Sequence, residues 1–451
     1  MPKKKTALTI EERLQQALVP AEEQPYEVPE NWVWVRLIGN VNSCLDGYRK
    51  PINSSERAKR VGKVPYYGAT GQVGWIDDYL TNEHLVLLGE DGAPFLDLLK
   101  DKAYIIFGEA WVNNHAHILK SYFGEIGNVF LMHYLNMVDY KDYVKGTTRL
   151  KLTQGSMQLM PFPLPPLSEQ QRIVERIEEL FAKLDEAKER LQEVADSFAV
   201  RKAAILHNAF TGELTKQWRR ENGVSYESWE EITWGSFIEK IEAGKNWNAL
   251  GRPPKNGEFG VVKVSAVTWG EFLEDESKTC TEESQWNEEK RISVGDFLFS
   301  RANTIQLVGN CVIVKDVKRK LMLSDKILRF SLSERVYDFF ALWYTRTSSY
   351  RKQIESVASG NQDGMRNISQ NNMKMIIFPL PTLPEQHEIV RLIDDLLARE
   401  RAAQQAAEQA LASIDLMKKS ILARAFRGEL GTNKASEASA LELLKQVLAE
   451  N

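Results

Sequence analysis

The feature that most constrains this chain is an internal repeat of about 53 residues, which occurs twice without insertion or deletion. The copies run over 162–214 and 378–430, and each opens with a proline-rich lead, FPLPPLSEQ or FPLPTLPEQ. Both close with the pattern A-F-x-G-E-L. A period this long excludes a solenoid. It predicts two similar halves, each a globular block followed by a long helix, and indicates either a target with two separated half-sites or two copies of one partner.

The totals describe an ordinary soluble protein that is too long for one compact core. Its 451 residues predict two or three domains. The apolar and charged contents, 43% and 27%, are typical of globular chains, and no apolar run approaches the roughly 20 residues of a membrane helix. The basic N-terminus lacks a following apolar segment, so no signal peptide is expected. Three scattered cysteines predict reduced thiols in a cytoplasmic protein.

Apolar residues recur at heptad spacing within both copies of the repeat. The first copy has no glycine or proline between 167 and 211, which predicts one helix of about 40 residues and about 60 Å. A two-fold axis between equivalent halves would make the two helices antiparallel. Ordinary bundle helices, or helices that dimerise with another chain, are the alternatives. The predicted core of the pair is Ile173, Ile177, Leu180, Leu184, Leu191, Ile389, Ile393, Leu396, Ile414 and Ile421.

The blocks between the helices share little beyond an entry tryptophan, Trp32 or Trp229, which indicates a common frame carrying two different readers. Short apolar runs at 85–89, 104–108, 260–264 and 297–300 predict strands, and 127–140 and 334–357 predict helical segments. The expected fold class is α+β: two globular domains separated by two long antiparallel helices in a coiled coil, with a pseudo-two-fold internal repeat. The predicted segments are a helical N-terminus (1–24), a first globular domain (25–161), a first long-helix region (162–214), a second globular domain (215–377), a second long-helix region (378–430) and a helical tail (431–451).

The lead motifs, the long helices and the ending A-F-x-G-E-L-T, continued by K-Q-W-R at 216–219, resemble the specificity subunit of type I restriction–modification systems. The resemblance covers essentially the whole chain. Segments 244–245, 262–270 and 299–303 resemble one version of that family's target-recognition domain, and 66–69 with 88–92 resemble another.

The resemblance implies a non-catalytic reader of double-stranded DNA, with one target-recognition domain for each half of a bipartite, asymmetric site. The helices would set the unread gap and dock two methyltransferase subunits. Restriction subunits would complete the complex. S-adenosylmethionine would bind the methyltransferase, so no cofactor is expected in this chain.

Motifs for catalysis are missing from the sequence. It contains no Asn-Pro-Pro-aromatic motif for amino methylation and no P-loop. Glu90 and Asp91 are either acidic metal ligands of a nuclease or a turn that Gly92 punctuates, and the turn is preferred. His115 and His117 have no obvious further ligand, so no metal site is predicted. A structural adaptor whose blocks bind peptides is a rival of another class.

Base readout needs Arg or Lys for guanine and Asn or Gln for adenine, whereas clustered lysines contact phosphate. Arg301 and Asn303 rank highest because they follow a strand-like run and match the family pattern. Trp247 and Trp269 either stack on a base or belong to the core, and the core is preferred. The candidate DNA-binding residues are Arg49, Lys50, Lys59, Arg60, Lys63, Thr70, Gln72, Asn113, Asn114, His115 and Arg149 in the first block, and Lys245, Asn246, Asn248, Arg252, Arg301, Asn303, Gln306, Lys326, Asn361 and Gln362 in the second.

Overall fold

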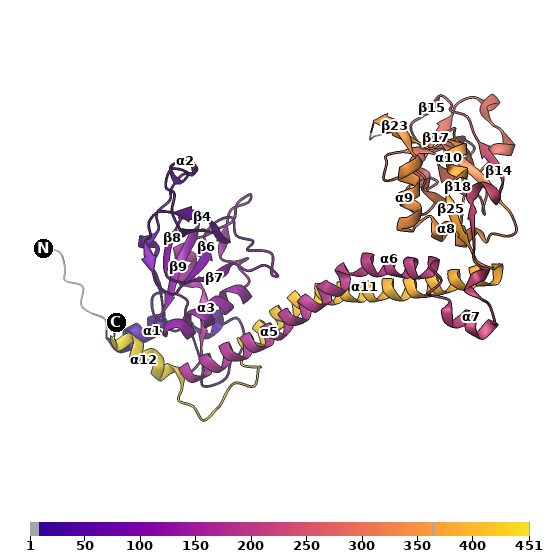
Figure 1. The fold of residues 1–451 in the computed structure, drawn as a ribbon. Coiled ribbons are helices and arrows are strands. Elements are labelled where there is room, and N and C mark those ends of the chain that lie inside the picture. The colour runs from indigo at the N-terminus through magenta and orange to yellow at the C-terminus, as the bar shows by residue number, and fades with distance from the viewer. Residues whose placement is uncertain (1–8, 363–364, 451) are drawn as a thin grey trace. The chain divides into compact units, whose positions relative to one another are not determined.

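The computed structural model describes residues 9–362 and 365–450, with the side chains of 361 and 362 left out. The chain divides into two compact units, one made of residues 1–192 with 408–451 and the other of 193–407. Each unit joins one globular domain to one end of both long-helix regions (Figure 1). Across the described ranges, no helix has both the length and the apolar character needed to cross a membrane.

The long helices are α5 (Leu167–Asp196), α6 (Phe198–Phe210) and α11 (Leu383–Ala425), and α5 packs against α11. In the first unit the side chains of Asp185 and Lys418 lie 2.6 Å apart, and those of Lys188 and Asp415 lie 3.6 Å apart. One residue number rises as its partner's falls, so the helices run antiparallel. The antiparallel pair inferred from the repeat is therefore confirmed.

The predicted seam is buried most deeply where each helix leaves its globular domain. Ile173, Ile177, Ile389 and Ile393 are fully buried, and Ile414 is 3% exposed. The half-buried members are Leu180, Leu184, Leu191, Leu396 and Ile421. Val194 and Met417, which continue the same heptad spacing, are instead 38% and 49% exposed.

The prediction of one unbroken first helix was wrong, because a turn at Ser197 separates α5 from α6. The Val194 carbonyl accepts hydrogen bonds from the Ser197 hydroxyl (3.0 Å) and the Arg201 guanidinium (3.1 Å). Side chains that compete for backbone carbonyls in this way bend or interrupt helices. The second copy has no such pair and is continuous over 43 residues.

The first unit is an α+β domain with one helix against its main sheet. Four antiparallel strands lie in the order β2-β9-β6-β7, and α3 (Gly124–Met137) packs on them. A second sheet has the order β4-β3-β8-β5, with β3 and β8 parallel. The remaining bounds are α1 Ile10–Ala17, β2 Asn42–Cys44, α2 Ser54–Arg57, β3 Val64–Gly68, β4 Gly71–Ile76, β5 Thr81–Asn82, β6 Leu85–Gly89, β7 Ala103–Ile106, β8 Glu109–Val112, β9 Ala116–Ser121, β10 Val144–Lys145, β11 Lys151–Leu152, α4 Gln154–Leu159 and α12 Ala440–Glu450.

The second unit repeats the plan of two four-stranded sheets with unrelated residues. Its main sheet, β14-β22-β18-β20, has the same strand order by sequence, and its second sheet, β15-β17-β16-β21, again contains one parallel pair. Where the first unit has the two-stranded sheet β10-β11, the second has the three-stranded sheet β19-β24-β23. The remaining bounds are α7 Lys216–Asn222, β14 Ile238–Ala243, β15 Ala249–Leu250, β16 Phe259–Val262, β17 Ser277–Cys280, β18 Phe297–Ser300, β19 Ala302–Asn303, β20 Cys311–Ile313, β21 Lys320–Met322, β22 Ile327–Leu332, α8 Asp338–Tyr344, α9 Ser348–Val357, β23 Ser359–Gln362, β24 Met365–Asn367 and α10 Gln370–Lys374.

Most predicted elements lie close to where the sequence placed them. Strands β6 and β18 match their runs, but 260–264 is a strand only to Val262 and continues as a 3-10 turn. The helical segment at 334–357 is two helices, α8 and α9. The first and last described helices also meet, since α1 packs against α12 beside the first domain's core (Figure 1).

Each proline-rich lead forms a strand that pairs with the strand entering the same domain. In the first unit β1 (Val33–Arg36) pairs antiparallel with β12 (Pro161–Leu164). In the second, β13 (Glu230–Thr233) pairs with β25 (Ile377–Leu380) in the same way. Prolines are tolerated there because each sheet has only two strands and therefore only edges. The beginning and end of each globular domain are thus held side by side.

Candidate nucleic-acid interface

A buried glutamate at the start of each long helix anchors the domain that precedes it. Glu169 accepts a hydrogen bond from the indole of Trp32 at 2.8 Å, and Glu385 accepts one from Trp229 at 3.0 Å. Both carboxylates are fully buried. These contacts fix the entry of each domain against its helix. Sequence reasoning missed them, although the repeated Glu-Gln pair and the two entry tryptophans were the available signal.

The segment after each helix completes these anchors. Gly212 and Gly428 end the two helices with left-handed backbones (φ +77° and +73°), where a side chain would collide with Tyr226 or Pro29. Beyond them, Thr215 donates to Glu385 (2.6 Å) and Asn433 donates to Glu169 (2.8 Å). The repeated glycine is therefore required by the turn that brings the chain back to the other helix's first residues.

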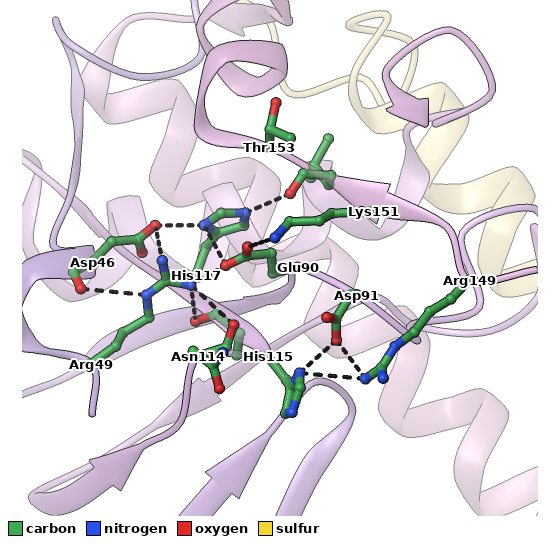
Figure 2. A network of polar contacts seen from close by, with 12 residues as sticks. Asp46, Arg49, Glu90, Asp91, Asn114, His115, His117, Arg149, Lys151 and Thr153 are labelled. Atoms are coloured by element: carbon green, nitrogen blue, oxygen red, sulfur yellow. Dashed lines mark hydrogen bonds and ion pairs between the residues drawn. The ribbon is translucent and has the colours of Figure 1, made fainter. Parts of the chain in front are cut away.

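In the first unit several predicted DNA-binding residues gather around Glu90 and Asp91 (Figure 2). Glu90 pairs with Arg49 and with Lys151, and Asp91 pairs with His115 (2.6 Å) and Arg149 (2.7 Å). Although burial raises the pKa of Glu90, hydrogen bonds from Lys151 and Arg49 bring it below its usual value. The carboxylates of Glu90 and Asp91 are therefore both paired with basic side chains. This arrangement suits a structural turn better than a metal-dependent nuclease site.

The members of this network differ in how far they reach solvent. The side chains of Arg149 and Lys151 are 60% and 51% exposed, whereas that of Arg49 is only 16% exposed. Arg49 also bonds Asp46 and the carbonyls of Asn114 and Ala116, so it holds the loop in place. Asn113 is buried and accepts from the His115 backbone. Arg149, with His115, presents the polar groups that a ligand can reach.

A second group of cations in this unit surrounds Trp111. The ammonium of Lys50 and the guanidinium of Arg60 lie 5.9 Å and 4.6 Å from its ring centre, within the range of cation–π attraction. Arg60 also pairs with Asp77. Lys59 and Lys63 are exposed beside them, Thr70 lies at the turn between β3 and β4, and Gln72 lies near the start of β4.

The structure also brings together Cys44, Asp46 and His117, whose candidate ligand atoms lie within 4.8 Å of one another. Sequence spacing did not reveal these neighbours of His117. The His117 ring already bonds Asp46 (2.7 Å) and the Leu152 carbonyl (3.0 Å). Burial, with the Asp46 charge, raises the pKa of the Cys44 thiol to about 12, which keeps it protonated. We therefore interpret these three residues as a hydrogen-bonded cluster rather than a cation site.

In the second unit, backbone hydrogen bonds and strand pairing bring several candidate residues near one another. The Gly244 N–H bonds the Ser324 carbonyl, which places Lys245, Asn246 and Asn248 beside the 324–326 loop. The Arg301 N–H bonds the Lys326 carbonyl, and Asn303 pairs with Arg366 on β24. Strand β23, which carries Asn361 and Gln362, is the partner of β24; their side chains lie outside the described part of the chain.

Other candidates of the second unit lie apart from these residues. Arg252 makes a bidentate pair with Glu258 (both 2.7 Å), and Gln306 is exposed in the loop between β19 and β20. Trp247 packs in a small cluster with Val261 and Met322, as the core interpretation predicts. Trp269 is 68% exposed, so that interpretation was wrong for Trp269.

Comparison with known proteins identifies the class. The model of the family "Type I restriction modification DNA specificity domain" matches residues 29–196 and 226–410. The chain is 27% identical over 340 residues to the type I restriction enzyme EcoKI specificity subunit of Escherichia coli K12, with 71% of each chain covered. It is 22% identical over 457 residues to the EcoDI specificity subunit of Escherichia coli, covering 94% of this chain and 96% of that one.

Solved structures share the fold. The HsdS subunit from Thermoanaerobacter tengcongensis superposes with a TM-score of 0.60 at 16% identity, covering 90% of this chain and all of that one. A chain from a study of complex assembly and conformational transition of the type I restriction–modification system gives 0.59 over similar lengths. The chain described here belongs to the type I restriction–modification specificity (HsdS) family. It is accordingly a non-catalytic DNA specificity subunit with two target-recognition domains.

Proposed function

We propose that each globular domain reads one half of a bipartite, asymmetric DNA site, and that the helix pair sets the unread spacer and docks two methyltransferase subunits. Restriction subunits join the complete complex, and S-adenosylmethionine binds the methyltransferase. The observation that carries this proposal is the repeated anchor, Trp32 on Glu169 and Trp229 on Glu385, beneath two domains of like topology and unlike sequence. Two domains that share their topology and anchor but carry different loops are suited to two different half-sites.

Within each domain the residues proposed to contact DNA have different tasks. In the first unit Arg149 and His115 contact base edges, while Lys50, Lys59, Arg60 and Lys63 contact phosphate. The second unit uses Arg301 and Asn303 for bases. Arg301 makes no side-chain hydrogen bond or ion pair with any described residue, so its guanidinium is available for bidentate contact with guanine.

A domain exchange tests the division of labour. Residues 25–161 are replaced by the first target-recognition domain of a relative, and the chain is expressed with its methyltransferase. Methylation-sensitive sequencing of the host should show that one half of the methylated motif changes and the other half is retained. The matched exchange of 215–377 should change the opposite half. If either exchange alters both halves together, the proposal fails.

The spacer is tested by lengthening the helix pair. Four residues are inserted near Gln192 and four near Leu411, which face one another if the pairing of Asp185 with Lys418 is continued. One extra turn adds about 6 Å, or about two base pairs at about 3.4 Å each. The methylated motif should keep both half-sites and gain a longer gap. An altered half-site with an unchanged gap would show that the helices do not set the spacing.

A further inference from the structure

The two junctions between globular domain and helix pair differ in charge at positions that the repeat makes equivalent. In the first unit Lys418 pairs with Asp185 at 2.6 Å and lies over the ring of Phe181. The 216-residue offset of the repeat places Lys202 at the position of Lys418 and Arg401 at that of Asp185. An ion pair in one unit is therefore replaced by two cations in the other.

A third cation joins them in the second unit. The guanidinium of Arg346, just after α8, donates to the carbonyls of Cys311 (2.6 Å) and Gly270 (3.2 Å). Arg401 donates to the Leu397 carbonyl (3.2 Å). Burial, together with the charges of Arg346 and Arg401, lowers the pKa of Lys202. Among the described residues, none of these three cations forms an ion pair with a carboxylate. The cluster thus has no ion-pair partner in the part of the chain that the structure describes.

Arg346 and Arg401 line a cavity of about 530 Å³ with the aromatic side chains of Trp269, Phe339 and Trp343. Trp269 is 68% exposed at its edge. The cavity also has acidic residues, but Asp394 accepts a hydrogen bond from Trp343 and Asp316 pairs with Lys318. Asp394 is also about 10 Å along the helix from Arg401. Glu271 is the remaining acidic residue of the lining.

Tryptophan beside arginine in a partly enclosed site is the composition of protein-binding hot spots. Phosphate contacts, in contrast, are made by open, polar surfaces. In the first unit the equivalent charges are matched internally, since Lys418 pairs with Asp185 and Lys419 pairs with Asp101 (3.2 Å). Because these charges are already paired, the first unit does not require a bound anion at this position.

We propose that Lys202, Arg346 and Arg401 bind a carboxylate carried by an aromatic or apolar segment of a protein partner. This inference rests on the proposed function, in which the partner is the methyltransferase. It follows that two copies of the partner bind this chain unequally, because only the copy at the second unit makes the charged contact. The partner's acidic residue supplies the counter-ion that Asp185 provides within the first unit.

Arg401→Asp tests the proposal, because the new carboxylate can pair with Lys202 as Asp185 pairs with Lys418. The full chain is titrated with the methyltransferase of the same system, and stepwise dissociation constants are measured by native mass spectrometry. Arg401→Asp should weaken one of the two binding steps by at least about tenfold and leave the other unchanged. Asp185→Arg is the matched control on the other unit and should not weaken the affected step.

Other outcomes count against the proposal in distinct ways. If the variant binds both methyltransferase copies like the wild type, or loses both equally, the cluster is not the contact described. If it instead loses affinity for random duplex DNA with no methyltransferase present, the cluster binds phosphate. A wild-type chain that binds no methyltransferase would refute the proposed function, and this inference with it.

Discussion

The two buried glutamates, Glu169 and Glu385, occupy equivalent positions of the repeat but are stabilised by different neighbours. Glu385 accepts from Thr215 and pairs with Arg219 of α7 at 2.6 Å. Glu169 forms no ion pair with any residue that the structure describes, and it accepts hydrogen bonds from Trp32, Asn433 and Thr432. Burial raises the pKa of Glu169, despite these hydrogen bonds. The second unit thus stabilises its anchor by charge and the first by polar groups of the returning tail.

The largest expected effect is a difference in unfolding free energy between variants of the two glutamates. Glu385→Gln leaves the buried guanidinium of Arg219 without its carboxylate, which should lower the free energy of unfolding of the second unit by about 3 kcal/mol. Glu169→Gln removes a costly buried charge and should change the first unit by less than about 1 kcal/mol. Urea unfolding followed by tryptophan fluorescence measures both. Equal losses in the two variants would show that Arg219 is not what distinguishes the anchors.

A smaller effect concerns pH and sharpens the same comparison. The pKa of Glu169 is higher in the folded protein than in the unfolded chain. Its contribution to the free energy of unfolding is therefore fully present below the ordinary glutamate pKa of 4.5, and it is lost as the pH rises through the raised pKa. The melting temperature of Glu169→Gln should therefore rise relative to that of the wild type as the pH increases from about 4.5 to 7. Glu437, whose pKa its hydrogen bond to Arg172 lowers, acts in the opposite direction and is present in both proteins.

Thermal melting across this pH range supplies the measurement. Glu437→Gln is the control, since it should lose stability relative to the wild type above the ordinary glutamate pKa rather than gain it. If the wild type and Glu169→Gln keep a constant difference at every pH, the carboxyl group of Glu169 does not titrate differently in the folded state.

The sequence predicted the architecture well because the repeat and the heptad spacing are local patterns. Residues such as Ile173 and Ile389 lie in the core because every turn of a long helix presents the same face. The break at Ser197 was missed, since serine within a helix interrupts it only when a partner such as Arg201 competes for the same carbonyl. Spacing alone does not report that competition.

The interface was harder to predict for a different reason. Arg49 and Arg149 look alike in sequence, yet one is fixed by Asp46 and Glu90 and the other reaches solvent. Burial and pairing depend on residues far along the chain, which composition does not locate. The same holds for His117, whose neighbours Cys44 and Asp46 lie about seventy positions away in the sequence.

The pairing of β1 with β12, and of β13 with β25, has a consequence for how such genes can change. Since Arg36 lies opposite Pro161 and Thr233 opposite Ile377, each intervening segment leaves and rejoins the frame at a single ladder. A pair of crossovers in the DNA that encodes the two strands of one ladder would import a whole new domain with its ends already in register. Under the function proposed above, such an exchange would change one half-site and leave the other intact.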